Sequence, residues 1–566
     1  MKIEPVLTPV IRFGNLLRDE KKQIYAIYFY SVLNGGVGLI LPLGIQAIIN
    51  FILGGRMTTS WLILVLIVSF GYIFGGFLEI SQRYLMEKLQ QRIFTNTSFS
   101  FAYRLPRIKM DVLRDKFPPE LANRIFDAVN LQKGTAKLII DYSTYSVQIL
   151  FGLILLTFYH PFFIFFGLLL LIILFGIFYF TSGKGIKTAM KESTSKYETA
   201  YWLEEIARTC ATFKLAGNSN LPFIRVDKIL QKYVDFRNNH FNILIFQHKV
   251  MIGFKVLIMG GFLIVGSSLL IDDEISIGQF VAAEIVIMMI ISSVEKLILD
   301  LEVAYDTLVA VEKIGLIMDM EMEKAEGTEK AFKSEYKGLE FEISNLTYQT
   351  IDKEETILDK INLKINPGEK IILTGGSGSG KSTLIHLMAG LFEDYTGKIQ
   401  VNGLPISTMN LEKYRSIIGD SLLHESLFLG TIRENITLGK DIPEENIRKI
   451  IELVGLNKYI FHLPDDIDTQ VLPEGRGLSK VLISKIILAR CLVGEPKALL
   501  LEEMFYHISN EVRERVMDYM MKEPFTMILI TQDWDLITKV DRVIELEKGS
   551  ITFDGDSLQY KEIKGI

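Results

Sequence analysis

The chain has 566 residues, of which 49% are hydrophobic and 23% are charged, and its formal net charge is −6. This length is too great for one ordinary domain, and an ordinary charged fraction beside an apolar excess means that the apolar residues are concentrated in part of the chain. There is no basic tract or acidic tail, which argues against nucleic-acid binding. Only Cys210 and Cys491 are present, so no disulfide framework is expected.

Long uncharged runs in the first half predict six membrane-spanning helices. Residues 142–180 contain no Asp, Glu, Lys or Arg, and this run is too long for one span. We therefore expect a helical hairpin that turns at "YHPF", beside His160 and Pro161. The predicted spans lie within residues 23–55 and 57–78, on either side of the turn in 142–180, and at about 250–271 and 276–298.

Two charged residues fall inside the predicted spans. Lys255 lies near the inner end of the fifth, where its long side chain can reach the interface. Glu284 interrupts the sixth, and a bare carboxylate there is costly unless it faces a polar cavity or a partner. We predict that Glu284 faces a pathway through the membrane; a structural ion pair or a position nearer the interface are the alternatives.

The connections between spans predict the orientation. The N-terminus and segments 80–137 and 183–249 are rich in Lys and Arg, whereas the opposite connections are short and offer only Arg56, His160 and an acidic "DDE". Positive residues beside spans are retained inside, so both termini are expected in the cytoplasm. The two long inner connections predict spans that continue as helices below the membrane.

After about residue 325 the sequence becomes more polar and charged, as in a soluble domain. Short β-rich runs such as "KIILTGG", "ALLLEE" and "TMILIT" alternate with helical stretches, which predicts an α/β domain with a parallel sheet. The expected division is therefore a transmembrane domain at 1–325 and a second domain at 326–566.

The stretch "TGGSGSGKST", Thr374–Thr383, matches G-x-x-x-x-G-K-[ST] between an apolar strand and a helix. This context argues against a chance Gly/Ser loop and predicts a phosphate cradle. Backbone N–H groups approach the phosphates, a lysine reaches the terminal ones, and a hydroxyl at the helix N-terminus supports Mg²⁺. The residues expected to bind nucleotide are Gly375, Gly376, Ser377, Gly378, Ser379, Gly380, Lys381, Ser382 and Thr383, with Ser382 at the metal.

With these motifs the chain resembles the ATP-binding cassette (ABC) exporters in their half-transporter form. "LDKINLKINPGEKIILTGGSGSGKSTL", "LFLGTIRENI" and "EPKALLLEE" are similar to cassette landmarks in order and spacing, and "PPELANRIFDAV" resembles the first cytoplasmic coupling segment. The resemblance implies a membrane α-helical domain of the type IV exporter kind followed by a P-loop NTPase cassette. "TPVIRFGNLL" and "ISIGQFVAAEIV" look most like bacterial type I secretion and peptide exporters.

The family's signature, LSGGQ, is altered here. The matching run is "LSKVL": Leu478 and Ser479 are retained, and Lys480 and Val481 replace both glycines. In the family these glycines let backbone amides of one subunit close on the γ-phosphate bound to the other. Side chains at both positions would crowd that approach.

The hydrolytic groups that the resemblance implies are also incomplete. Glu502 replaces the aspartate that supports Mg²⁺, and Glu503 occupies the general-base position; the alternative is two acidic residues at a strand end without a role. Gln532 takes the place of the γ-phosphate-sensing histidine, and Ser509 that of an aspartate in the family's SALD turn. Leu423 replaces the glutamine that links the metal and the membrane domain, and the neighbouring His424 is a weaker candidate for that role than for a structural one.

The residue that stacks on adenine in the family also differs. Thr350 occupies its position, with Tyr348 two residues earlier. Residues two apart on a strand share a face, so Tyr348 is a candidate base-stacking residue.

These departures predict a chain that holds ATP and Mg²⁺ well and hydrolyses ATP weakly at most, because groups that act as a unit lose orders of magnitude in rate when some are missing. The expected location is the bacterial inner membrane. The family implies a homodimer or a heterodimer with a second half-transporter, and the secretion members suggest a periplasmic adaptor and an outer-membrane channel as partners.

Two hypotheses follow. In the first, the chain is a subunit of an exporter of peptide, protein or lipid. In the second, it is a structural or regulatory subunit of an envelope complex, and ATP is a gating or assembly ligand.

Overall fold

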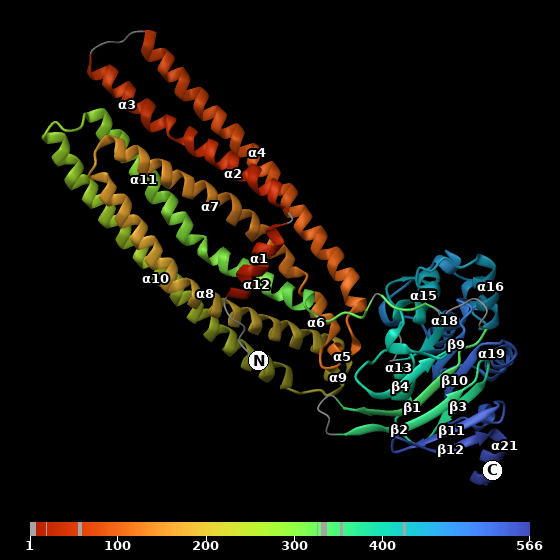
Figure 1. The fold of residues 1–566 in the computed structure, drawn as a ribbon. Coiled ribbons are helices and arrows are strands. Elements are labelled where there is room, and N and C mark those ends of the chain that lie inside the picture. Colours follow the sequence, from red (N-terminus) through yellow and green to blue (C-terminus); the bar gives the residue numbers. More distant parts are fainter. Residues whose placement is uncertain are drawn as a thin grey trace. The chain divides into compact units, whose positions relative to one another are not determined.

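The computed structural model describes residues 7–18, 20–54, 59–324, 326–329, 337–350, 355–422 and 426–565. The chain forms two compact units (Figure 1). One comprises Met1–Pro106 and Lys116–Met320, and the other comprises Arg107–Asp115 and Glu321–Ile566. Each is described by itself below.

The first unit is a bundle of long helices. Among the described residues, six stretches are long and apolar enough to cross a membrane, which confirms the predicted number of spans. The hairpin turn is confirmed as well, since one helix ends at Tyr159 and the next begins at Phe163. The helices are α1 (Leu7–Arg18), α2 (Lys21–Gly38), α3 (Ile40–Leu53), α4 (Thr59–Arg104), α6 (Pro118–Asn123), α7 (Phe126–Tyr159), α8 (Phe163–Arg208), α9 (Cys210–Leu215), α10 (Leu221–Ile271), α11 (Ile277–Leu299) and α12 (Leu301–Met318).

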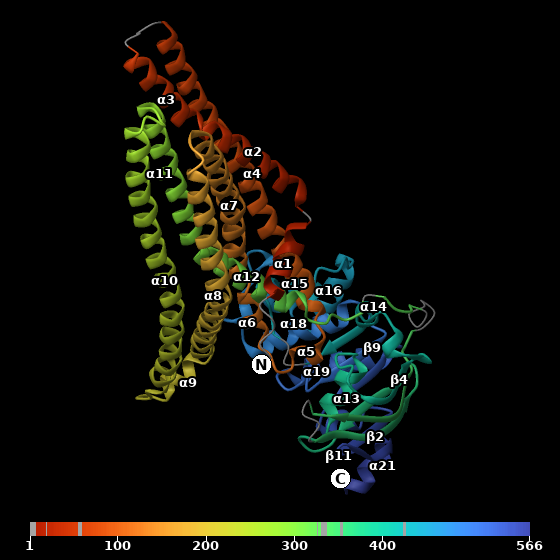
Figure 2. The same ribbon diagram turned by 60° about the vertical axis from the view of Figure 1, so that its left-hand side comes forward.

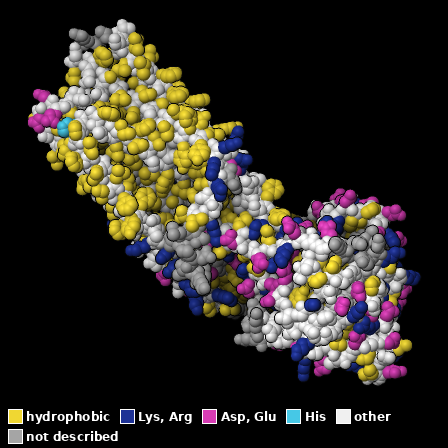
Figure 3. Space-filling model, in the orientation of Figure 1, with side chains coloured by type: hydrophobic (Ala, Val, Ile, Leu, Met, Phe, Trp, Pro, Cys, Tyr) yellow, Lys and Arg dark blue, Asp and Glu magenta, His cyan; other side chains and the backbone are white. Residues whose placement is uncertain are grey.

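The types of side chain on the surface of the bundle change along its length. Apolar side chains cover its visible surface, whereas Lys and Arg gather towards one end (Figure 3). At the other end, the turn after α7 and the turn before α11 meet, because His160 Nε2 lies 2.8 Å from Glu274 Oε2. Helices α8 and α10 lie side by side (Figure 2). Lys255 on α10 forms an ion pair with Glu295 on α11, so it has a partner within the bundle.

The second unit is an α/β domain, as predicted. Its six-stranded sheet has the order β12-β11-β3-β10-β9-β6, in which all neighbours are parallel except β11 and β12. An antiparallel sheet has the order β2-β1-β4-β5, and β7 pairs with β8. The strands are β1 (Phe341–Gln349), β2 (Thr356–Ile365), β3 (Lys370–Thr374), β4 (Thr396–Val401), β5 (Leu404–Pro405), β6 (Ile418–Ser421), β7 (Gly430–Thr431), β8 (Gln470–Val471), β9 (Ala498–Glu502), β10 (Thr526–Ile530), β11 (Arg542–Glu547) and β12 (Ser550–Asp556).

Both faces of the parallel sheet are covered, which explains why its central strands β3, β10 and β9 are mostly apolar and almost fully buried. Alternate residues face alternate sides: Ile372 packs in a core with α18 and α19, and Ile371 packs in a second core with α13 and the antiparallel sheet. The helices are α5 (Met110–Leu113), α13 (Lys381–Met388), α14 (Leu411–Ser416), α15 (Ile432–Thr437), α16 (Glu444–Leu453), α17 (Asn457–Ile460), α18 (Lys480–Val493), α19 (Asn510–Lys522), α20 (Trp534–Ile537) and α21 (Ser557–Lys564).

Residues Arg107–Asp115 belong to this second unit although they lie between α4 and α6 in the chain. Ile108 pairs with Met322 as an isolated antiparallel bridge, and Lys109 Nζ lies 3.0 Å from Glu393 Oε2. The expected coupling segment "PPELANRIFDAV" begins three residues later, and its helix α6 is part of the first unit. Sequence reasoning did not single out 107–115.

Candidate nucleotide site

The carboxyl ends of β3, β10 and β9 lie side by side in the parallel sheet, and the polar residues that follow them meet at one edge. The loop after β3 carries three glycines in the left-handed region: Gly375 (φ 135°), Gly378 (φ 75°) and Gly380 (φ 99°). A Cβ atom at Gly375 would lie 2.1 Å from the carbonyl oxygen of Leu546. The glycine pattern that identified the loop is therefore required by its backbone conformation.

Lys381, the first residue of α13, lies over this loop. Its Nζ donates hydrogen bonds to the carbonyl oxygens of Gly375 (2.9 Å) and Gly376 (2.7 Å) and to Ser379 Oγ (3.2 Å). Burial lowers the pKa of the Lys381 amine, and the carboxylates of Glu502 and Glu503 oppose this shift. A bound phosphate could replace these carbonyl oxygens as the hydrogen-bond acceptor of the Lys381 amine.

Ser382 and Glu502, the two residues predicted to hold a metal ion, are in contact. The Ser382 hydroxyl donates a hydrogen bond to the carboxylate of Glu502, which ends β9. One hydroxyl and one carboxylate suit Mg²⁺, which favours oxygen ligands and completes its shell with water and substrate phosphates. The extra methylene of Glu502, compared with aspartate, does not prevent this contact.

Glu503 and Gln532 lie beside the loop in constrained positions. Glu503 has a positive φ of 47°, and its backbone N–H donates to the Ile530 carbonyl at 3.0 Å. Gln532 Nε2 donates to the Gly375 carbonyl at 3.0 Å, so its amide is bonded to the phosphate loop. An amide can donate such a hydrogen bond but cannot take up a proton near neutral pH as an imidazole does.

A cavity of about 430 Å³ adjoins the loop. It is lined by Thr350, Glu355, Thr356, Ile357, Gly378, Ser379, Gly380, Lys381, Ser382, Thr383, Lys548 and Gly549. The expectation for Tyr348 needs correction, because this residue does not line the cavity: it is 1% exposed and its ring packs in the domain core. Thr350, at the position of the family's stacking residue, does line it.

The altered signature begins helix α18. Ser479 caps this helix, with its Oγ accepting from the Leu482 backbone N–H at 3.3 Å, and Leu478 precedes it half-buried. Lys480 and Val481 occupy the first turn, and both are exposed. Their side chains therefore stand where glycines would leave the backbone open.

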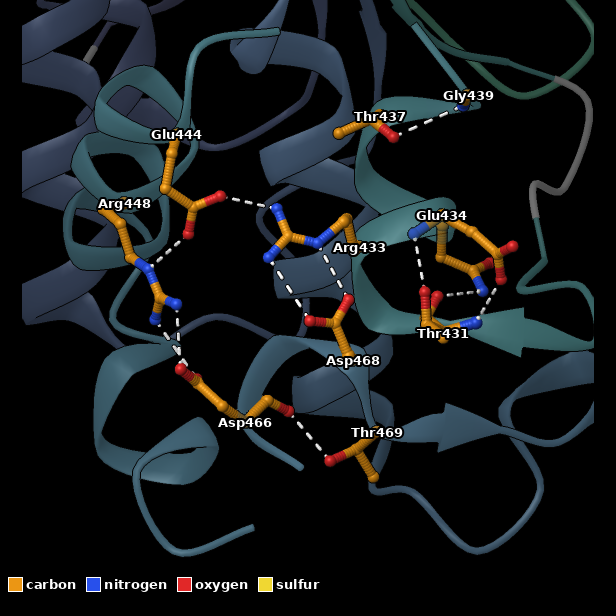
Figure 4. Close-up of polar contacts among 11 residues, drawn as sticks. Thr431, Arg433, Glu434, Thr437, Gly439, Glu444, Arg448, Asp466, Asp468 and Thr469 are labelled. Carbon is orange, nitrogen blue, oxygen red and sulfur yellow. Dashed lines mark hydrogen bonds and ion pairs between the residues drawn. The ribbon is translucent and has the colours of Figure 1, made fainter. Parts of the chain in front are cut away.

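A network of ion pairs supports the region before the signature (Figure 4). Arg433 contacts Glu444 at 2.5 Å and Asp468 at 2.8 Å, and Arg448 contacts Glu444 and Asp466 at 2.8 Å each. The network joins α15, α16 and the turn that leads to β8. Arg433 and Arg448 lower the pKa of Glu444, and Arg448 lowers that of Asp466.

The remaining predicted positions make no contact that supports the site among the described residues. Ser509 stands at the start of α19, and its side chain does not cap that helix. Leu423 and His424 lie outside the described residues.

The bundle holds a second cavity, of about 560 Å³ and strongly polar. It is lined by Asn34, Glu79, Gln82, Arg83, Met86, Glu87, Gln90, Lys133, Ala136, Lys137, Ile140, Asp141, Thr144, Tyr145, Gln148 and Lys296. Glu284 is half-buried on α11 and is not part of this lining. Sequence reasoning missed this set, although its members recur every three or four residues along α4 and α7, the spacing of one helix face.

Comparison with known proteins follows the same division. Residues 24–294 match the ABC transporter transmembrane region, and residues 358–506 match the ABC transporter cassette. The chain belongs to the ABC transporters. It is 30% identical over 293 residues to the leukotoxin translocation ATP-binding protein LktB of Mannheimia haemolytica, and equally to that of Bibersteinia trehalosi. Each match covers 51% of this chain and only 41% of the relative.

The fold of the ABC transporter chain also matches a solved structure. A bacterial Atm1-family ABC exporter with ATP bound superposes with a TM-score of 0.84 over 96% of this chain and 97% of that one, at 17% sequence identity. At this identity the match establishes the exporter-type fold alone.

Proposed function

We propose that this chain is one half of a dimeric ABC exporter in a bacterial inner membrane, with both termini in the cytoplasm, and that it binds ATP with Mg²⁺ and hydrolyses it weakly or not at all. The observation that carries this is a phosphate loop whose glycines adopt the left-handed conformation, with a Ser382–Glu502 contact, in a chain whose signature has Lys480 and Val481 in place of both glycines.

In this proposal the loop's backbone N–H groups and Lys381 hold the phosphates. Mg²⁺ held by Ser382 and Glu502 would neutralise phosphate charge. Glu503 would orient the attacking water. Gln532, whose amide is bonded to the Gly375 carbonyl, can donate and accept hydrogen bonds but cannot carry the positive charge of a protonated histidine. The groups for phosphate and metal are present and several groups for the transition state are not, so binding without fast turnover is expected.

Dimerisation matters because each signature in the family serves the partner's phosphate loop. This chain's signature would crowd the partner's site, while its own site lacks the histidine. A heterodimer with a better cassette therefore still has two compromised sites unless the partner compensates.

The polar cavity in the bundle supports a hydrophilic cargo. Its lining carries both charges, including a Glu79–Arg83 pair at 2.8 Å and Lys137, which pairs with Asp300 at 2.6 Å. Most of these charged residues fall at or just below the predicted cytoplasmic ends of the spans, in or beside segment 80–137, where a polar lining suits the entrance to a pathway between the helices. A peptide or protein fits this lining better than a lipid tail does, and the likeness to a leukotoxin translocation protein points the same way. The alternative, a regulatory subunit with ATP as assembly ligand, shares the binding site and differs in lacking transport.

Thermal unfolding of the full-length protein tests the binding. ATP with Mg²⁺ at a hundred times its Kd should stabilise the folded state by about 2.7 kcal/mol, and Lys381→Ala should remove that effect. Lys398→Ala, an exposed lysine on β4, is the matched control and should keep it. A well-folded parent protein that shows no nucleotide-dependent shift would refute the proposal.

A further inference from the structure

The cavity beside the phosphate loop has two ends of different chemistry. One end is the loop itself, Gly378–Thr383. The other is made by Thr350, Glu355 and Thr356 of the β1–β2 hairpin and by Lys548, which follows β11. Ile357 and Gly549 adjoin the loop, and the Gly549 backbone N–H donates to the Ser379 carbonyl at 3.2 Å. Because the loop takes the phosphates, the nucleoside of a bound nucleotide would face the second end.

This second end contains no aromatic ring among the described residues that line it. The sequence between Thr350 and Glu355, which lies outside the described residues, is "IDKE" and contains no aromatic residue. An aromatic platform is the usual source of affinity for a base, since every base offers a π-face for stacking.

Tyr348 is unavailable as a substitute. Its ring stacks on Phe392 with 5.9 Å between centroids, and the guanidinium of Arg114 lies 5.2 Å from the Tyr348 centroid and 4.8 Å from that of Phe392. All three residues belong to the second unit. Turning Tyr348 towards the cavity would break this cluster and open the core in which it is buried.

The polar groups at this end offer little to read a base. The Thr350 backbone N–H donates to the Glu355 carbonyl at 2.9 Å, and the Thr350 hydroxyl accepts from the Glu355 backbone N–H at 3.1 Å, so these groups close the hairpin. The side chains of Glu355 and Lys548 are exposed. Hydrogen bonds from exposed, mobile side chains compete with water and discriminate weakly.

We infer that this site recognises the triphosphate with its Mg²⁺ and is nearly indifferent to the base, so that nucleoside triphosphates as a class are its ligands. The inference rests on the proposed nucleotide binding and assigns its affinity to the triphosphate and Mg²⁺, with little contribution from the base.

Calorimetric titration of the full-length protein in Mg²⁺ with ATP, GTP, CTP and inorganic tripolyphosphate tests this. The three nucleotides should bind within about fivefold of one another, and tripolyphosphate within about tenfold of ATP. ATP binding more than about fivefold tighter than both GTP and CTP, or ATP binding without tripolyphosphate binding, would overturn the inference while leaving ATP binding intact. If none of the four binds, the proposed function fails as well.

A second experiment adds an aromatic residue on which a base can stack. Thr350→Tyr should tighten ATP, GTP and CTP each by about tenfold and leave tripolyphosphate unchanged, because only a base can stack. Gln349→Tyr, an exposed neighbour that does not line the cavity, should change none of the four. A folded Thr350→Tyr protein that gains nothing for the nucleotides, or gains equally for tripolyphosphate, would contradict the assignment of this end to the base.

Discussion

At the scale of single residues, the proposed weak hydrolysis is assigned first to three substitutions. Gln532 is bonded to the loop carbonyl of Gly375, and Lys480 and Val481 put side chains on the first turn of α18. In the structure the glycines of the phosphate loop keep the left-handed conformation beside these residues. The proposal can therefore be tested by restoring the family's residues at the three positions.

Restoring the family's residues should raise ATP hydrolysis. A triple variant, Gln532→His with Lys480→Gly and Val481→Gly, should increase the ATPase rate of the full-length protein by at least about tenfold, because transition-state contacts are worth this much or more. Adding Glu503→Gln should abolish the gain, which shows that the restored rate uses the proposed base. If the triple variant binds ATP and stays as inactive as its parent, the limiting defect lies at Leu423 or Ser509.

A buried lysine gives the cassette a pH-dependent stability. Lys370 is 3% exposed at the start of β3, and its Nζ donates to the carbonyl oxygens of Glu523 (2.8 Å) and Phe525. Burial lowers the pKa of Lys370 to about 8, against the opposing charges of Asp541 and Glu523. The unfolded chain then binds more protons than the folded one above about pH 8, so the free energy of unfolding rises with pH from there towards the ordinary lysine pKa.

Comparison with Lys370→Met isolates this contribution. Between pH 7 and pH 10 the melting temperature of the parent should rise relative to that of the variant, by about 2–4 °C. Two proteins whose melting curves stay parallel across this range would show that Lys370 keeps an ordinary pKa.

At the scale of elements, sequence periodicity found the helices and the parallel strands because each carries a continuous chemical pattern. The runs "KIILT" and "TMILI" are buried throughout and mostly apolar, since both faces of that sheet are covered. The same reasoning failed at Tyr348, although burial along β1 does alternate from Leu346 to Gln349. The Tyr348 ring packs on Phe392 in the domain core, and the local sequence does not indicate a contact with a residue so distant in the chain. The polar cavity was missed for a similar reason, because its lining comes from helices that are distant in sequence.

The ion pairs around Arg433 provide an element-scale prediction. Arg433→Ala removes contacts from α15 to both Glu444 and Asp468, whereas Arg448→Ala removes contacts that do not involve α15. These side chains are partly exposed, so we expect the loss for Arg433→Ala to be below about 1 kcal/mol in the free energy of unfolding. Hydrogen exchange should show it as faster exchange in α15 and β8, with the Arg448→Ala protein less affected in α15.

The pH dependence of this network has a definite sign. The pKa values of Glu444 and Asp466 are lowered by their arginine partners. Carboxylates of lowered pKa stabilise the fold above their ordinary pKa range and lose this effect as the pH falls through the lowered values. The difference in exchange between parent and Arg433→Ala should therefore be full at pH 7 and shrink below about pH 4. A difference that persists at lower pH would point to packing and not to charge.

At the scale of the whole molecule, the sequence predicts which end of the bundle is cytoplasmic, and two native cysteines make that testable. Cys210 is exposed at the start of α9, within the Lys/Arg-rich segment 183–249, and Cys491 is 2% exposed in the cassette core. A membrane-impermeant maleimide should label Cys210 in inside-out vesicles and leave it unlabelled in intact spheroplasts, because basic segments beside spans are retained inside. Cys210→Ser should remove the signal.

Adding Asp273→Cys to that variant places a thiol in the turn between α10 and α11, and this thiol should show the reverse pattern. The His160–Glu274 contact puts this turn at the same end of the bundle as the α7–α8 turn, so both reporters concern one topology. Labelling of Cys210 from outside would contradict the predicted orientation and refute the exporter proposal, since the phosphate loop would then face away from cytoplasmic ATP.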